Sequence, residues 1–325
     1  MFFHCGQAMM RCSITRRSSF DAESERQTLI AGLLAPHAAI PPKYFYDELG
    51  CLLYAAICSL SEYYLTRAEA SIFTRNRDDI ASAIGSGKQM VDLGAGDCRK
   101  AAEWFHILQP GRYFAVDMAE VHLGHSLGRL AEEFPDMEMT GIILDIARGL
   151  ALDSDLERRP VTFFYPGSSI GNFTPEAALQ LLGQIRLHCQ PPGSGLLIGV
   201  DTKKDAARLD VAYADPLGIT AAFNLNTLNH VNRLIGSDFR VDDFRHVGFY
   251  HEVMGRVEMH LEARRDCTAH IDGRVREFAA GERIHTENSW KYARHEFEAL
   301  LLQAGYTSIR CWQDSAGDFC VFYAA

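Results

Sequence analysis

GKQMVDLGAGDCRKAAEWFHIL (residues 87–108) passes from an apolar strand through a glycine loop into an amphipathic helix. Residues 90–93 are short and mostly apolar, as a buried strand is. GAGD (94–97) supplies two glycines for a tight loop, and residues 98–108 carry apolar side chains at helical spacing. Such a strand–loop–helix unit is typical of a parallel sheet.

The same alternation continues along the chain. Four more strands are expected, at 112–116, 139–144, 161–165 and 195–200, with helices between them that include 175–189. Strands that alternate with helices predict a doubly wound α/β fold. The chain ends in a helix (291–304) and two strands (307–312 and 318–324), a pair that often closes nucleotide-binding sheets of this kind.

Residues 203–290 interrupt this pattern. A long helix is expected near 219–236, followed by antiparallel strands at 243–250, 254–265, 267–271 and 282–286, with an Asp-Gly hairpin signal in IDGR. The block therefore reads as an insertion into the α/β fold. We expect three parts: a disordered extension (1–20), a doubly wound α/β domain (68–203 plus 291–325) and a second, α+β domain (21–67 plus 204–290).

Composition limits the function. The 325 residues carry a net charge of −10 and lack a long basic run, which argues against a nucleic-acid footprint. No apolar run reaches the length of a membrane span, and the first residues do not follow the order of a secretory signal. The nine cysteines form no C-x-x-C pair and no zinc-site spacing, so we expect reduced thiols, no metal and a cytoplasmic protein.

Polar groups follow several strands, at the edge of a parallel sheet where ligands bind. Gly94 and Gly96 suit a close backbone approach, while Asp117 and Asp145 end the next two strands. This set suits either a dinucleotide or S-adenosylmethionine. Arg99 stands where the dinucleotide motif has its third glycine, so methyl transfer is favoured. Helix capping is the alternative role for each aspartate.

FFYPGSSIGNF (163–173) ends the fourth strand with small, polar residues. Its place in the strand order predicts a loop beside the reacting methyl group. Gly167 and Gly171 allow backbone groups to face a small ligand, and Asn172 offers both a donor and an acceptor. A helix cap before Pro175 is the alternative role for Asn172, but a cap does not explain PGSSIG.

Six motifs together resemble the L-histidine Nα-methyltransferases of ergothioneine biosynthesis: PPKYFYDELG, SEYYLTRAE, the G-x-G loop with Lys100, FFYPGSSIGNF, the AAFNLN segment with HVNRLIG, and IHTENSWKY. They occur in family order from about residue 27 to the C-terminus. The resemblance implies a Rossmann-like class I S-adenosylmethionine methyltransferase sheet with an inserted α+β substrate-binding domain. It also implies trimethylation of the α-amine of L-histidine to hercynine.

The resemblance implies a role for individual residues. S-adenosylmethionine, which leaves as S-adenosylhomocysteine, is expected to contact Tyr46, Gly94, Gly96, Lys100, Asp117, Asp145 and Ile146. Histidine is expected to contact Tyr63, Gly167, Asn172, Tyr213, Met259, Glu287 and Ser289. Asn172 and Tyr213 match the pair that binds the substrate carboxylate, and Glu287 and Ser289 match the pair that binds the far ring nitrogen. GAGDCRK departs from the serine-rich loop that is commoner in the family.

A neutral imidazole has one donor and one acceptor, so a carboxylate and a hydroxyl favour it over apolar side chains. Methyl transfer from a sulfonium is an in-line displacement, which needs the amine to be oriented toward the methyl group and unprotonated. No histidine is positioned as a base. We expect the proton to leave to water, with Tyr46 and Tyr63 as the catalytic residues that polarise the path. A monomer is expected. The alternatives are N-methylation of another amino acid or of an aromatic amine such as a tryptophan derivative, a non-catalytic partner protein, and an NAD-dependent oxidoreductase.

Overall fold

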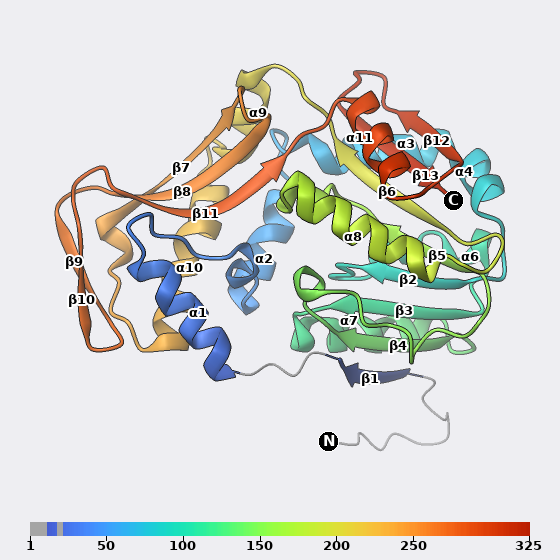
Figure 1. The fold of residues 1–325 in the computed structure, drawn as a ribbon, viewed down its shortest axis with the longest axis horizontal. Coiled ribbons are helices and arrows are strands. Elements are labelled where there is room, and N and C mark those ends of the chain that lie inside the picture. Colours follow the sequence, from blue (N-terminus) through green and yellow to red (C-terminus); the bar gives the residue numbers. More distant parts are fainter. Residues whose placement is uncertain (1–11, 18–21) are drawn as a thin grey trace.

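The computed structural model describes residues 12–17 and 22–325. An eight-stranded sheet with the order β1-β4-β3-β2-β5-β6-β13-β12 forms the larger part of the molecule (Figure 1). All neighbours from β1 to β6 pair in parallel, whereas β13 pairs antiparallel with both β6 and β12. The strands are β1 (Cys12–Arg16), β2 (Gln89–Leu93), β3 (Arg112–Asp117), β4 (Glu138–Ile143), β5 (Val161–Tyr165), β6 (Gly195–Asp201), β12 (Ile309–Gln313) and β13 (Phe319–Ala324).

Helices cover both faces of this sheet. One face packs on α8 (Pro175–His188) and α11 (Arg294–Gln303), which appear in front of the strands in Figure 1. The other face packs on α3 (Tyr64–Arg75), α4 (Arg77–Ile84), α5 (Arg99–Ala102), α6 (Phe105–Leu108) and α7 (Glu120–Glu133). The central strand β2 is buried along its whole length, as expected when both faces are covered. The predicted doubly wound fold is confirmed.

The inserted part has its own sheet and core. Its strands are β7 (Phe244–His251), β8 (Arg256–Ala263) and β11 (Arg283–Trp290) in one antiparallel sheet, and β9 (Cys267–Ile271) and β10 (Arg274–Phe278) in a hairpin. Its helices are α1 (Ala22–Leu34), α2 (Glu48–Ile57), α9 (Ala206–Tyr213) and α10 (Ile219–Ile235). Short 3-10 turns are η1 (Pro42–Phe45), η2 (Ile146–Arg148), η3 (Ser169–Asn172) and η4 (Val241–Asp243). The helix α10 packs on α2, η1 and β7, so N-terminal residues complete the inserted layer (Figure 1).

Three expectations for secondary structure are wrong. Residues 12–16 are a parallel strand beside β4, not part of a disordered extension, while residues 1–11 and 18–20 of that prediction lie outside the described part. The helix expected over 98–108 is two short helices. The strand expected over 282–286 continues to Trp290, so residues 287–289 lie within the strand. The other domain boundaries given above stay predictions.

Candidate active site

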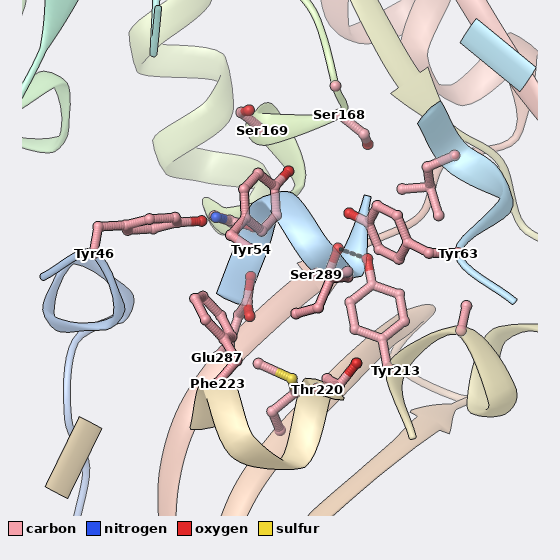
Figure 2. Close-up of a pocket in the computed structure, with 16 residues that line it drawn as sticks. Tyr46, Tyr54, Tyr63, Ser168, Ser169, Tyr213, Thr220, Phe223, Glu287 and Ser289 are labelled. Atoms are coloured by element: carbon pink, nitrogen blue, oxygen red, sulfur yellow. Dashed lines mark hydrogen bonds between the residues drawn. The ribbon is translucent and has the colours of Figure 1, made fainter. Parts of the chain in front are cut away.

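A cavity with about 540 Å³ of empty space, part of it open to solvent, lies between the two sheets. Sixteen residues from both parts of the chain line it (Figure 2). They are Tyr46, Tyr54, Ile57, Tyr63, Leu65, Gly167, Ser168, Ser169, Asn172, Ala212, Tyr213, Thr220, Phe223, Met259, Glu287 and Ser289. The seven residues predicted to contact histidine are all among them, and so is Tyr46.

The loop after β5 forms one wall of the cavity. Gly167 has φ +78° and donates its N–H to the Glu69 carboxylate at 2.7 Å. A Cβ on Gly171 would stand 2.8 Å from the Trp290 carbonyl oxygen, so this glycine lets the loop touch β11. Ser168 accepts the backbone N–H of Asp201 at 2.9 Å, and Ser169 donates to the Pro166 carbonyl at 3.3 Å. Both serines therefore fix the shape of the loop.

Asn172 lines the cavity and is not the cap of the next helix. The N-cap of α8 is Thr174, whose hydroxyl accepts the N–H of Ala177 at 3.3 Å, with Pro175 in the first turn. The capping alternative for Asn172 is therefore wrong. Its amide group is left to face the cavity.

A bulge in β11 turns Glu287 into the cavity. Opposite residues of an antiparallel pair share a face, and His285 pairs with His260 whereas Glu287 pairs with Met259. Met259 and His260 are consecutive and point to opposite faces, so the register shift at Thr286 moves Glu287 to the face that Met259 occupies. Thr286 holds the bulge with a bond from its hydroxyl to the Met259 carbonyl at 2.9 Å.

The Glu287 carboxyl group stands in a mostly aromatic setting, near Tyr46, Tyr54 and Phe223 in Figure 2. Burial raises its pKa to about 7, against the opposing effect of the Lys291 ammonium group. Ser289, two residues further on the same strand, bonds instead to Tyr213, with 2.9 Å between the hydroxyl oxygens. Glu287 and Ser289 thus share a strand face, but Glu287 lies among aromatic rings whereas Ser289 is hydrogen-bonded to Tyr213.

Four tyrosine rings, those of Tyr46, Tyr54, Tyr63 and Tyr213, line the cavity. Tyr46 meets Tyr54 and Phe223 edge-on, each at 5.8 Å between ring centroids, and Tyr63 meets Tyr213 at 6.1 Å. Burial raises the pKa of Tyr46, Tyr54 and Tyr63 well above the ordinary value, so all three stay neutral phenols. Tyr54 and Phe223 also line the cavity and are not among the residues predicted from the sequence, because an aromatic residue on an amphipathic helix is usually part of the core.

Three of the residues predicted to bind the cofactor lie at the ends of β2 and β3: Gly94 and Gly96 follow β2, and Asp117 ends β3. Asp117 accepts the N–H of Gly96 at 2.8 Å and the N–H of Ala119 at 2.9 Å, one on each carboxylate oxygen. A carboxylate has about four acceptor positions, so it can also take the two hydroxyls of a ribose. Asp117 is only partly buried, and Gly94 follows β2, the strand beside β3. This arrangement fits a nucleoside at the strand ends.

Two other cofactor candidates already hold protein partners. Asp145 bonds Lys43 at 3.1 Å and caps η2 through the Ala147 N–H, so its capping role is real. Ile146 follows it and packs against the core under α8. Lys100 bonds Glu69 at 2.6 Å.

Glu69 is a site residue that the sequence analysis missed. It is 1% exposed and uses one carboxylate oxygen for Lys100 and the other for the N–H of Gly167. It therefore joins α5, which follows the glycine loop 94–97, to the loop after β5. The signal was present in SEYYLTRAE, where a glutamate follows buried positions of an amphipathic helix.

Among residues 12–17 and 22–325, no group of three or more His, Cys, Asp or Glu side chains could hold a metal ion. Within the same described residues, no helix is long and apolar enough to cross a membrane.

The strand order, with its antiparallel β13 and its ligand loops after β2, β3 and β5, is that of the class I S-adenosylmethionine-dependent methyltransferases. Residues 25–325 match the family described as "Histidine-specific methyltransferase, SAM-dependent", and the chain belongs to this family.

Relatives of known name agree with this family assignment. The chain is 37% identical over 305 residues to the histidine N-alpha-methyltransferase of Mycolicibacterium smegmatis, covering 92% of this chain and 94% of that protein. It is 36% identical to the protein of that name from Mycobacterium tuberculosis, covering 97% and 100%. It is also 32% identical to the ergothioneine biosynthesis protein 1 of Neurospora crassa, covering 84% of this chain and 32% of that protein.

Proposed function

We propose that this enzyme transfers three methyl groups from S-adenosylmethionine to the α-amine of L-histidine and forms hercynine. The observation that carries the proposal is Glu287, a partly buried carboxyl group that faces an aromatic cavity. Burying a carboxylate without a partner is costly, so a ligand with an N–H donor is favoured at this position. An imidazole supplies that donor.

The remaining groups of histidine match the rest of the cavity. Asn172 and the Tyr213 hydroxyl offer donors for an α-carboxylate, the role that the family resemblance implies for this pair. Met259 and Phe223 supply apolar walls for the flat ring. An apolar amino acid would leave Glu287 unpaired, which supports selection of histidine over leucine or phenylalanine.

Bound S-adenosylmethionine supplies the methyl group and carries it as an electrophilic sulfonium. The protein orients the amine beside Gly167 and keeps it as a free base for each transfer. No histidine is among the residues that line the cavity, and the neutral phenols of Tyr46 and Tyr63 are poor bases. We therefore propose that the proton leaves to water and that these phenols order its path. The tyrosine faces also suit a product with a fixed positive charge.

We propose that Asp117 holds the ribose and that the backbone at Gly94 and Gly96 lies along the cofactor. Lys100, Asp145 and Ile146 are the other proposed contacts. The bond between Glu69 and Lys100 keeps this loop in register with Gly167. A cytoplasmic location and a monomeric state stay predictions from the sequence.

Calorimetry with S-adenosylhomocysteine present, followed by mass analysis of the product, tests the proposal. Histidine should bind and gain three methyl groups in turnover, while phenylalanine, leucine and tryptophan should be poor acceptors. A product with one methyl group, or better turnover of tryptophan than of histidine, would contradict it. The second outcome would instead support the aromatic-amine alternative.

A further inference from the structure

Lys291 is a lysine whose side chain is 0% exposed, directly after β11. Its ammonium group has three neighbours: Asp201 Oδ2 at 2.7 Å, the Tyr213 hydroxyl at 2.8 Å and Ser289 Oγ at 2.9 Å. An ammonium group has three protons, so each proton has one acceptor. Lysine is rarely buried this completely, and Lys291 has the paired partner that such burial requires.

Counting protons fixes what the two hydroxyls present to the cavity. Tyr213 and Ser289 each accept a bond from Lys291, and one of them donates to the other. The two hydroxyls have two protons between them, so one proton is used in their mutual bond. The other proton has no acceptor among Lys291, Tyr213 and Ser289, so it is free to point at a ligand. Both hydroxyls line the cavity.

Three charged groups, Lys291, Lys204 and Asp201, lie behind the two hydroxyls and together carry one net positive charge. Asp201 is 0% exposed and pairs with Lys291 and with Lys204, so two lysines face one aspartate. The Tyr64 hydroxyl donates to the same carboxylate at 2.7 Å and stays neutral. The next charged pair outward, Arg208 with Asp318, adds no net charge. A buried excess of one positive charge attracts an anion strongly because the surroundings screen it weakly.

We propose that Lys291 is a positioning and specificity residue that makes the enzyme require a free α-carboxylate on its acceptor. Lys291 holds Tyr213 and Ser289 so that Ser289 donates to Tyr213 and the Tyr213 proton points at the carboxylate. It also supplies the nearest buried positive charge to that carboxylate. The inference rests on the proposed function and extends it, because it selects free amino acids against decarboxylated or esterified forms.

The test compares histidine with histamine, which has the same ring and amine and lacks the carboxylate. Binding is measured by calorimetry with S-adenosylhomocysteine present. In Lys291→Met we expect the affinity for histidine to fall about 10- to 100-fold, the usual effect of losing a hydrogen bond that involves a charge. The affinity for histamine should stay within about threefold, since no carboxylate is present to feel the change.

Lys204→Met is the matched control. It removes a positive charge from the same aspartate, but Lys204 bonds Asp201 and Tyr64 and not the two cavity hydroxyls. Because Lys204→Met removes a positive charge but leaves the bonds from Lys291 to Tyr213 and Ser289, we expect a smaller loss of histidine affinity than in Lys291→Met. The affinity for histamine should stay within about threefold of the wild type. An equal loss for histidine and histamine in Lys291→Met, or the same selective loss in Lys204→Met, would overturn the inference.

If Lys291→Met does not fold, the double variant Asp201→Asn with Lys291→Met removes both members of the buried pair and is read in the same way. The two proposals fail differently. If the wild type forms no methylated histidine, the proposed function is wrong. If it forms hercynine and binds histamine as tightly as histidine, only the role of Lys291 is wrong.

Discussion

Replacing Glu287 by glutamine should make the empty enzyme more stable at pH 8 and leave its stability unchanged near pH 4.5. The carboxyl group has a pKa of about 7 in the folded protein, against 4.5 for the ordinary side chain. Its stabilising contribution is therefore complete below pH 4.5 and is lost as the pH rises through about 7. Glutamine stays neutral throughout and avoids this loss.

The size of the effect follows from the two pKa values. At about 1.4 kcal/mol for each tenfold change in proton affinity, the difference between 4.5 and about 7 amounts to about 3 kcal/mol. This is an upper value, because Glu287 is only partly buried and water can relax around the charge. The variant should also lose about tenfold in kcat/KM for histidine, since its amide accepts the ring N–H without a charge.

Urea unfolding of both proteins at pH 5 and pH 8 measures the first effect. The control is Glu252→Gln, on an exposed turn between β7 and β8, which should change the free energy of unfolding by less than about 0.5 kcal/mol at either pH. A Glu287→Gln variant that is no more stable than the wild type at pH 8 would refute the reasoning. So would an equal gain at both pH values, because burial of a charge predicts a gain only where the charge exists.

Three further predictions concern the loops and the phenols. Asp117→Ala should raise the KM for S-adenosylmethionine about 10- to 100-fold with little change in the KM for histidine, because two backbone N–H groups lose their acceptor. An unchanged cofactor affinity, measured by calorimetry, would argue against this prediction. Gly167→Ala, at φ +78°, should cost about 1–2 kcal/mol in urea unfolding, whereas Gly183→Ala, in open space on α8, should be neutral or stabilising; equal effects would contradict this. Tyr63→Phe and Tyr46→Phe should lower kcat and change the pH–rate profile; if both stay as in the wild type, the proposed proton path is wrong.

The local sequence pattern predicted the bounds of those elements whose own residues determine their structure. The strand expected at 161–165 is β5 to the residue, and the helix expected at 175–189 is α8 to within one residue. The helix expected over 98–108 breaks between Ala102 and Phe105. The Glu103 carbonyl at this break accepts a bond from the Arg77 guanidinium group, 26 residues earlier, a contact that no local pattern predicts.

The site divides in the same way. Motif resemblance selected Glu287 and Tyr213, and both face the cavity. It did not select Lys291, whose partners Asp201 and Tyr213 lie far earlier in the chain and meet it only in the folded protein. Nothing in SWKY marks that lysine as buried, since lysine at a predicted helix start is usually exposed. Burial of a charge is a property of the whole fold and not of a local pattern.

The strand β1 replaces β4 as the edge of the parallel sheet. It pairs with β4 over five residues, and β4 would otherwise end the sheet with a row of unpaired backbone groups. Such open edges are templates for pairing between molecules. The strand β1 is short and mostly exposed, whereas β4 is buried at five of its six residues. A chain shortened to begin after Arg16 would keep every residue of the cavity, and we expect it to self-associate more readily through the apolar edge of β4.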